Sequence, residues 1–416
     1  MPHVFQRLLH LASPHLLKPS HIGLLASDLL RIHGPVHETT VHLRAVMNWL
    51  FRSCGCLHLE GSSAGYSITD GWRPAYPETT GYIIPTLLRY QRYAGEDRFR
   101  SLALTLADWE SAIQLPCGAV RGGYHGRDPF GVFKRSDVPV VFNTGMVLLG
   151  WTRALRETES AQTRRSLIDA ADWLVRMQEP DGSWSRGHSE ATSATSYSYY
   201  TMVAWSLAEA WSVTGCDAYR AAACRFVEWV LSLQAPNGFI PHMSFSDDAP
   251  PVLHTICYTL QGLIECGMRL GREDCVEAAV KPAERLMRAF ERHGRLHGHY
   301  NERWEPEGEY SCVTGEAQLS IVLTSLARIK DDLRYFNTAL KINDNLKRQQ
   351  PMRTGNPDMR GGVRGSLPVW GEYSRLNFPN WAAKFYADAL LEEETYMNQL
   401  MFRISSEAGT RPRADA

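Results

Sequence analysis

Two kinds of hydrophobic pattern alternate along most of this chain. The stretch 140–155 is apolar on nearly every side, as in a helix that is buried all round. The stretch 166–177 carries apolar residues on one face and charges on the other, as in a helix at a surface. The alternation continues in the pairs 201–213 and 219–233, 254–268 and 275–290, and 315–329 and 335–349. Buried helices that alternate with amphipathic ones predict an inner ring of helices inside an outer ring.

A weak repeat marks the ends of the amphipathic helices. In its clearest copies, 172–184 and 228–239, a Gln and one further residue precede Pro-Asp-Gly or Pro-Asn-Gly. These turns stop a helix because Pro cannot continue it and Gly accepts a positive φ. The anchors, separated by 64, 56, 59 and 57 residues, are Gln114, Gln178, Gln234, His293 and Gln350. Each step holds two helices and their loops, so each repeat is predicted to be an αα-hairpin.

The repeats predict a single toroid domain. One hairpin falls around 38–114, four more reach Gln350, and a last one holds 381–401. No Ser/Gly-rich linker divides the chain. We therefore expect an all-α toroid of six hairpins over 38–416, with residues 1–37 as an arm that caps the ring. Short β-ribbons are expected in the loops after Gly118, Gly238 and Gly294.

Composition narrows the classes of function. The chain has 416 residues, 44% hydrophobic and 21% charged, with a formal net charge of -1. It therefore has a large core and no basic surplus for binding nucleic acid. No run of about 20 apolar residues predicts a membrane span, and the N-terminus does not resemble a signal peptide. The nine cysteines are scattered, which favours free thiols in a reducing, cytoplasmic compartment. The oligomeric state is left open.

No cofactor or metal ion is expected. The sequence has no P-loop and no dinucleotide-binding fingerprint. His293, His297 and His299, with Glu302, come nearest to a metal-binding group. They fall in a Gly-rich turn rather than on one face of a helix, so we expect no metal there.

The stretch 70–86 gathers aromatic and hydroxyl side chains around one carboxylate, Glu78. Three prolines within it exclude an ordinary interior helix. Aromatic faces, hydroxyls and a carboxylate on a loop that enters a helix suit a cleft that binds sugar. The alternative is a packed, proline-rich corner whose hydroxyls are satisfied locally.

Several stretches resemble a bacterial family associated with polysaccharide biosynthesis. They are YPETTGYIIPTLL (76–88), NTGMVLLGW (143–151), MQEPDGSW (177–184), HTICYTLQGLIE (254–265), SCVTGEAQLSI (311–321) and GSLPVWGEYSRLNFPNWAAKFYADAL (365–390). The resemblance implies an (α/α)6 toroid, the six-hairpin fold that is similar to one used by glycoside hydrolases, uronate lyases and sugar C5-epimerases. Asn143 departs from this pattern, in which we expect Asp. If that Asp is an acid or base elsewhere, this chain lacks it.

In such rings the loops that lead from outer to inner helices line one end of the central funnel. The catalytic candidates at that end are Glu78, His254, Tyr76 and Tyr82. Glu78 would be a general acid with a raised pKa. Its alternative is a carboxylate that bonds backbone amides at a helix start. Neutral His254 would abstract a proton, or else serve only as a structural hydrogen-bonding group. Tyr76 and Tyr82 would act as phenol acids or bases, or else pack in the core.

Candidates for binding the substrate come from the same loops and helix starts. They are Trp72, Asn143, Tyr197, Tyr200, Glu316, Arg364, Trp370, Glu372, Arg375, Asn380, Trp381 and Lys384. Arg364, Arg375 and Lys384 would hold a substrate carboxylate, and the alternative is that they are solvated charges. Glu316 or Glu372 would supply the second carboxylate that glycoside hydrolysis requires.

Three functions remain open, and an oligo- or polysaccharide is the partner in each. The first is acid–base chemistry on a glycan that contains uronic acid. There, His254 or a tyrosine removes the C5 proton and Glu78 or another tyrosine is the acid, which gives a lyase or a C5-epimerase. The second is a glycoside hydrolase with a carboxylate pair on the same ring. The third is a glycan-binding scaffold without catalysis, which the departure at Asn143 keeps open.

Overall fold

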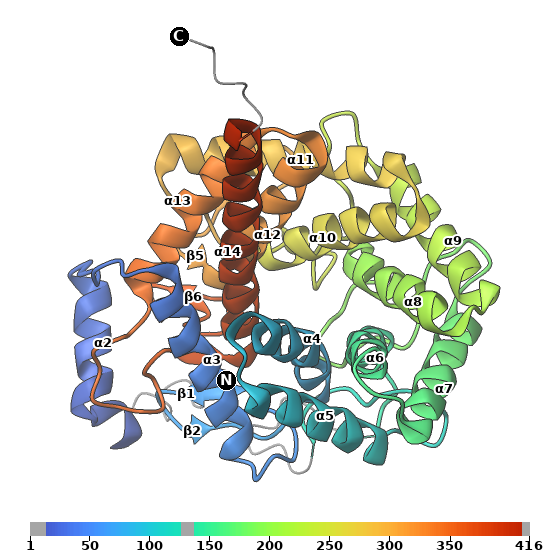
Figure 1. Ribbon diagram of the computed structural model, residues 1–416, viewed down its shortest axis with the longest axis horizontal. Helices are drawn as coiled ribbons and strands as arrows, with labels where there is room; N and C mark the ends of the chain where they lie inside the picture. Colours follow the sequence, from blue (N-terminus) through green and yellow to red (C-terminus); the bar gives the residue numbers. More distant parts are fainter. Residues whose placement is uncertain (1–13, 126–136, 410–416) are drawn as a thin grey trace.

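The computed structural model describes residues 14–125 and 137–409. Within them, six pairs of helices follow one another around a ring (Figure 1). The outer helices are α3 (Thr39–Gly55), α5 (Asp97–Ala112), α7 (Ala161–Met177), α9 (Asp217–Leu233), α11 (Glu273–His293) and α13 (Leu333–Gln349). The inner helices are α4 (Pro77–Ala94), α6 (Val141–Leu155), α8 (Thr201–Thr214), α10 (Leu253–Leu270), α12 (Val313–Lys330) and α14 (Asn380–Gly409).

The inner helices form a closed ring. Each inner helix contacts the next, and α14 contacts α4, which confirms the toroid that the alternating hydrophobic patterns predict (Figure 1). Small residues allow the close approach. A side chain at Gly81 would meet the backbone of Val147, and one at Gly262 would meet Thr201. The inner helices are apolar on nearly every side because each one packs on two inner neighbours and on an outer helix.

The Gln anchors of the repeat join consecutive hairpins. Nε2 of Gln178 donates to the carbonyl oxygens of Gly182 and Ala222, both at 2.9 Å. Equivalent pairs of bonds come from Gln114, Gln234 and Gln350. Gly182 has a φ of 92°, and a side chain there would meet the carbonyl oxygen of Arg225 on the next outer helix. The repeated residues therefore connect one hairpin to the next. The side-chain amide of the Gln satisfies two backbone carbonyl groups, and the Gly allows the turn to approach the next outer helix closely.

The strands are short and lie in the loops. A sheet of order β2-β1-β7 consists of β1 (Gly65–Ser67), β2 (Gly71–Trp72) and β7 (Asn377–Pro379), all antiparallel. The remaining pairs are β3 (His299–Tyr300) with β4 (Pro306–Glu307), and β5 (Ser311–Cys312) with β6 (Ser366–Leu367). The β3–β4 ribbon follows Gly294, as predicted. After Gly118 the described residues form only an isolated bridge between Arg121 and Pro139, and between Gly238 and α10 they form no strand. The sheet β2-β1-β7 joins the first hairpin to the last, and the sequence did not predict it.

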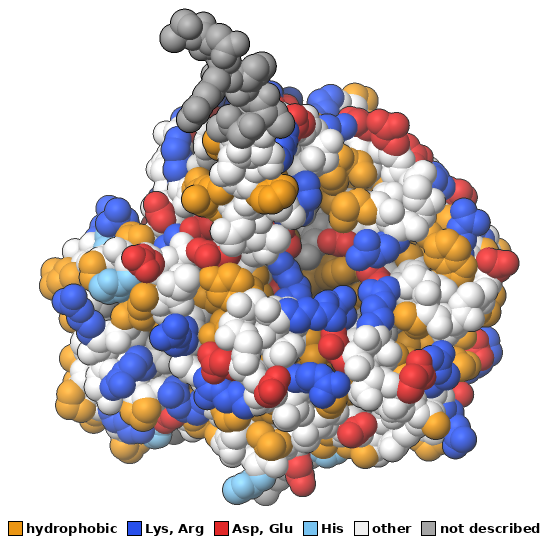
Figure 2. All heavy atoms as spheres, in the orientation of Figure 1, with side chains coloured by type: hydrophobic (Ala, Val, Ile, Leu, Met, Phe, Trp, Pro, Cys, Tyr) orange, Lys and Arg blue, Asp and Glu red, His pale blue; other side chains and the backbone are white. Residues whose placement is uncertain are grey.

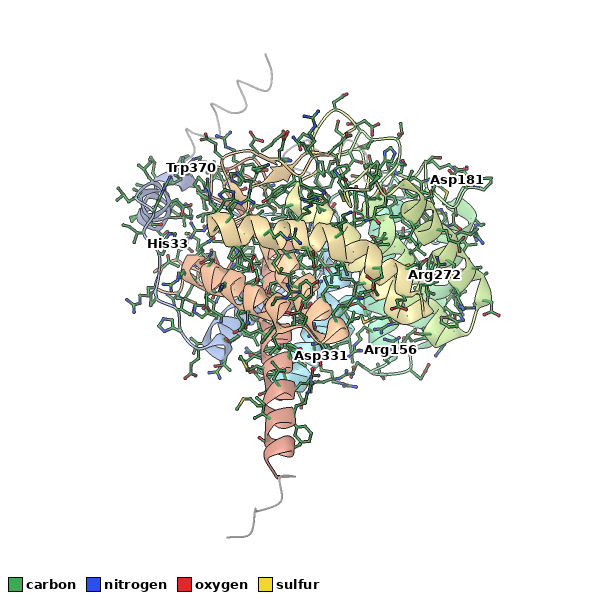
Figure 3. All side chains as sticks on the ribbon, turned by 90° about the horizontal axis from the view of Figure 1, so that it is seen from above. His33, Arg156, Asp181, Arg272, Asp331 and Trp370 are labelled. Carbon is green, nitrogen blue, oxygen red and sulfur yellow. The ribbon has the colours of Figure 1, made fainter. Side chains whose placement is uncertain are left out.

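The two ends of the ring differ. The connections from outer to inner helices are long, and those from inner to outer helices are short. Figure 3 shows Trp370 and Asp181 toward the long-loop end, and Arg156 and Asp331 toward the short-turn end. Figure 2 shows the short-turn end, where charged side chains surround a hollow at the centre of the ring. Arg156 pairs with Glu209 at 2.6 Å, and such cations offset the negative ends of the inner helices.

A short arm lies at the edge of the ring, beside α3 and β6 (Figure 1). It consists of η1 (Pro14–Leu17), α2 (Pro19–Leu29) and the extended segment that follows. Asp28 forms a buried ion pair with Arg364 and accepts from the backbone N–H of Val369 at 2.7 Å. The predicted arm also includes residues 1–13, which lie outside the described residues. No helix in the described ranges combines the length and apolar character that crossing a bilayer requires.

Candidate active site

Glu78 stands at the start of α4, at the long-loop end of the ring. Tyr76 is the N-cap, with extended backbone, and Pro77 is the first helical residue. Pro85 lies inside this inner helix, so the prediction that the prolines exclude an interior helix is wrong from residue 77 onward. The Tyr76 hydroxyl donates to Oε2 of Glu78 at 2.7 Å. Burial raises the pKa of Glu78 to about 7, although the bond from Tyr76 acts in the opposite direction. Near neutral pH the carboxyl group therefore exists in both protonation states, as a general acid requires.

Aromatic rings surround the Tyr76–Glu78 pair. The Tyr76 ring lies 5.8 Å from the Tyr124 ring and 6.4 Å from the Trp381 ring, both edge to face. Nε1 of Trp381 donates to the Tyr373 hydroxyl at 2.8 Å. Asn143, at the start of α6, donates from Nδ2 to the Arg121 carbonyl oxygen at 3.0 Å and also bonds the Tyr76 phenol.

His254 lies in the first turn of α10, in the same group of rings. Its ring centroid is 4.2 Å from Tyr258, 5.5 Å from Tyr373 and 5.7 Å from Phe385. Nδ1 bonds Oε1 of Gln318, and because an amide oxygen only accepts, Nδ1 carries the proton and Nε2 has a free lone pair. Burial lowers the pKa of His254 to about 3. The imidazole is therefore neutral across the physiological range.

The tyrosines of this cluster act as hydrogen-bond donors. Burial raises the pKa of Tyr82, Tyr200 and Tyr258 well above the usual value, and the nearby charge of Glu78 raises it further. Each phenol therefore keeps its proton near neutral pH. The Phe142 ring links two of them, at 5.6 Å from Tyr200 and 5.3 Å from Tyr258.

Three of the binding candidates, Tyr197, Tyr200 and Lys384, support the cluster from its border. The Tyr200 hydroxyl bonds Nδ1 of His188 at 3.0 Å, and the Tyr197 ring packs on the His188 ring at 4.6 Å. Lys384, on α14, lies 3.9 Å from the Phe385 ring and bonds Asp388 at 2.9 Å. Burial lowers the pKa of Lys384, and Asp388 opposes that shift. Lys384 is therefore a paired cation against the aromatic wall.

Several predicted binding residues have other contacts. Trp72 packs on Trp49 at 5.3 Å, in the sheet beside α3. Arg364 is buried and pairs with Asp28 of the arm, so it is not the solvated charge that we considered. Glu316 accepts from the backbone N–H of Leu296 at 3.1 Å, and burial raises its pKa to about 7.

The remaining candidates lie on the last long loop and at the helix start that follows it. The amide of Asn380 donates to Ser62 and Thr79, both at 2.9 Å, so it joins the first hairpin to the last. Trp370 is partly buried against the core, whereas Glu372 and Arg375 are exposed. In the described ranges, no three or more His, Cys, Asp or Glu side chains are grouped as a metal site.

The sequence did not identify part of the cluster. The missed residues are Tyr124, Phe142, His188, Tyr258, Gln318, Tyr373 and Phe385. Helical spacing offered a signal for two of them, because Tyr258 and Phe385 each follow a candidate by four residues on a buried helix. The others come from segments far apart in the chain, and only the closed ring brings them together.

Comparison with known proteins supports the fold. No protein-family model and no curated protein matches the sequence. Among solved structures, the chain is similar to the unsaturated glucuronyl hydrolase of Bacillus sp. GL1, with a TM-score of 0.66 and 16% identity over 85% of this chain and 96% of that one. For an unsaturated glucuronyl hydrolase specific for heparin, the TM-score is 0.64 and the sequence identity 15%, over 86% of this chain and 98% of that one. For a polysaccharide lyase, the TM-score is 0.61 and the sequence identity 10%, over 87% of this chain and 99% of that one. At these identities the likeness establishes the six-hairpin toroid.

Proposed function

We propose that this protein is a carbohydrate-active enzyme that acts by acid–base chemistry on a glycan containing uronic acid. The observation that carries the proposal is the carboxyl group of Glu78, with a pKa near 7, in the same aromatic cluster as neutral His254. Aromatic rings with hydroxyl groups at their edges suit the stacking and hydrogen bonding of sugars. The names of the similar structures, which are glucuronyl hydrolases and a polysaccharide lyase, support the same class of substrate.

In the lyase or epimerase hypothesis, Nε2 of His254 takes the C5 proton of a uronate. The electron pair moves into the sugar carboxyl group, where tyrosine hydroxyls stabilise it by donating hydrogen bonds. In a lyase the pair then forms the C4–C5 double bond, the C4–O bond breaks, and Glu78 gives its proton to the leaving oxygen. In an epimerase Glu78 or a tyrosine instead gives its proton to the opposite face of C5, and the electron pair returns from the sugar carboxyl group to form the new C5–H bond. The low pKa keeps the imidazole neutral but also makes it a weak base, so these hydrogen bonds are essential.

A hydrolase is the second candidate, favoured by the names of the similar structures. Addition of water across the C4–C5 double bond of an unsaturated uronate requires one acid to protonate C4 and a water at C5. Glu78 can give its proton to C4, and its carboxylate can then take the proton that the water loses as it adds to C5, so one carboxyl group is enough. A glycosidase with a carboxylate pair gains less support, because Glu316 is engaged with the Leu296 backbone and Glu372 is exposed.

One set of assays separates these hypotheses. A lyase raises the absorbance of the conjugated C4–C5 double bond when it acts on uronate oligosaccharides. A hydrolase of unsaturated sugars lowers that absorbance, a glycosidase increases only the reducing ends, and an epimerase only incorporates deuterium from heavy water. Binding without any of these signals identifies a glycan-binding scaffold and contradicts catalysis.

The proposal treats residues 38–416 as one catalytic unit, with the arm as an appendage. The candidate site takes residues from four hairpins through α4, α6, α10 and α14. A reducing, cytoplasmic compartment and a role in polysaccharide biosynthesis belong to the same proposal. All nine cysteines have free thiols, which suits such a compartment.

A further inference from the structure

We propose that a basic groove between the arm and the last long loop binds an acidic stretch of glycan, outside the candidate active site. The inference takes its ligand class from the proposed function. The groove has a volume of about 950 Å³. One wall is formed by residues 18–35 of the arm, and the other by residues of 348–364. The backbone N–H of Gly34 donates to the Arg348 carbonyl oxygen at 2.8 Å, which joins the two walls.

The charge in the groove is of one sign. Lys18, Arg348, Arg353 and Arg364 line it, and its described lining residues include no Asp or Glu. Arg348 and Arg353 are exposed, and in the described part of the chain neither side chain forms a hydrogen bond or ion pair. Arg364 is buried and paired with Asp28, yet its Nε has no hydrogen-bond partner. An anionic ligand would therefore pair with Arg348 and Arg353.

The remaining lining favours a charged glycan over a neutral one. The described lining residues include no Trp, Tyr or Phe, so the groove lacks the rings on which neutral sugars stack. It contains the amides of Gln349 and Asn356 and the hydroxyl of Thr354. The rest of the lining is largely apolar, so the charge and the few polar side chains select the ligand. A uronate chain carries a carboxylate and several hydroxyls on each sugar, so it matches the exposed guanidinium groups and these polar side chains.

The groove is connected to the candidate active site by one segment of chain. Residues 350–379 run from α13 to α14, and their first half lines the groove. Their second half carries Tyr373 and leads to Trp381, which bond each other in the aromatic cluster. A glycan held in the groove would therefore lie on the same loop that lines the site of chemistry.

Calorimetric titration with a uronate hexasaccharide from polygalacturonate tests this inference. The double variant Arg348→Ala/Arg353→Ala should bind about 5- to 10-fold more weakly at low salt, with an unchanged melting temperature. The control Arg165→Ala/Arg285→Ala removes two exposed arginines from α7 and α11 and should bind as the wild type does. The affinity for maltohexaose, a neutral hexasaccharide, should be the same in the wild type and in both double variants.

Equal losses in both double variants, or no loss in either, would overturn the inference. The inference would also be wrong if the double variant Arg348→Ala/Arg353→Ala lost affinity only for a single-stranded oligonucleotide or for anionic vesicles, and not for the hexasaccharide. The outcome is independent of turnover. If no glycan assay detects turnover but binding of the hexasaccharide still depends on Arg348 and Arg353, the proposed catalytic function is wrong and the proposed glycan-binding groove is supported.

Discussion

The Tyr76 hydroxyl donates a hydrogen bond of 2.7 Å to Oε2 of Glu78, two residues further along the chain. Pro77 separates them as the first residue of α4, and the backbone is extended at Tyr76. Thr79 and Thr80 both donate to the carbonyl oxygen of Tyr76. Thr79 and Thr80 therefore make the local bonds of a helix start, whereas Glu78 accepts from a side chain. The catalytic role of Glu78 stays a prediction.

Replacement of this carboxyl group should remove catalysis. We expect Glu78→Gln to lower turnover about 10²- to 10⁴-fold, because an amide cannot transfer the proton. The melting temperature should change little, since the amide oxygen can still accept from Tyr76. Steady-state kinetics and thermal melting measure the two effects. Glu273→Gln, at an exposed carboxylate at the start of α11, is the control. Full activity in Glu78→Gln would contradict the role of Glu78.

Loss of the phenol should shift the pH profile. The bond from Tyr76 lowers the pKa of Glu78, so Tyr76→Phe should raise that pKa above about 7. If Glu78 must be protonated, activity falls as pH rises through its pKa. The alkaline limb of the rate profile should therefore move to higher pH in the variant. A limb that stays in place, or moves to lower pH, would show that another group controls it.

His254 should matter for rate without titrating. We expect His254→Ala to reduce turnover by about 10² or more, because it removes the lone pair at Nε2. With a pKa of about 3, the imidazole is neutral between pH 5 and 8. The pH profiles of wild type and variant should therefore have the same shape over that range. Because the site is buried, His254→Gln is the companion variant that separates lost chemistry from lost packing. If a limb of the wild-type pH–rate profile between pH 5 and 8 were absent in the variant, His254 would titrate in that range and would not be always neutral.

Glu316 should make the protein less stable as pH rises. Its pKa increases from about 4.5 in the unfolded chain to about 7 in the folded one, because it is buried. The folded state therefore holds a proton that the unfolded state has lost, and stability falls across that window. Glu316→Gln keeps an acceptor for Leu296 without the charge. It should be more stable than wild type above pH 7, by up to about 3 kcal/mol, and similar to it at pH 4. If the difference in stability between Glu316→Gln and the wild type were the same at pH 4 and above pH 7, this explanation would be wrong.

Removal of Asp28 should loosen the arm. The variant Asp28→Ala leaves the buried guanidinium of Arg364 without its partner, at a cost of about 3–5 kcal/mol. Amides of α2 should then exchange hydrogen faster, while amides of α8, on another side of the ring, should not (Figure 1). Uniformly faster exchange would mean that the arm and the toroid unfold as one unit, and would contradict the proposed boundary at residues 37 and 38.

Much of the ring could be predicted because its rules are local. The anchor Gln178 and the turn glycine Gly182 recur at fixed spacing, since each joint requires an amide for two carbonyls and a glycine at a close contact. The sheet β2-β1-β7 could not be predicted in this way. It pairs residues 65–67 with residues 377–379, and no local pattern specifies partners so far apart.

The candidate site divides in the same manner. Glu78 and Tyr76 are neighbours in sequence, so the stretch around them was visible as a candidate. The pKa of Glu78 is raised by burial, which its sequence neighbours alone do not specify, and the environment of His254 depends on Gln318 and Tyr373. For charged and polar side chains, the sequence does not distinguish binding a ligand from stabilising the fold. Arg364 and Glu316 could serve a ligand or the fold equally well until their partners were known.

The sequence by itself determined which segments are helices, which of them are buried, and that they repeat as hairpins, because hydrophobic period and turn chemistry act over a few residues. Only the tertiary structure decided which polar groups meet at the mouth of the ring and which are engaged elsewhere. Burial and charge pairing are sums over side chains from distant hairpins, and ring closure sets those distances.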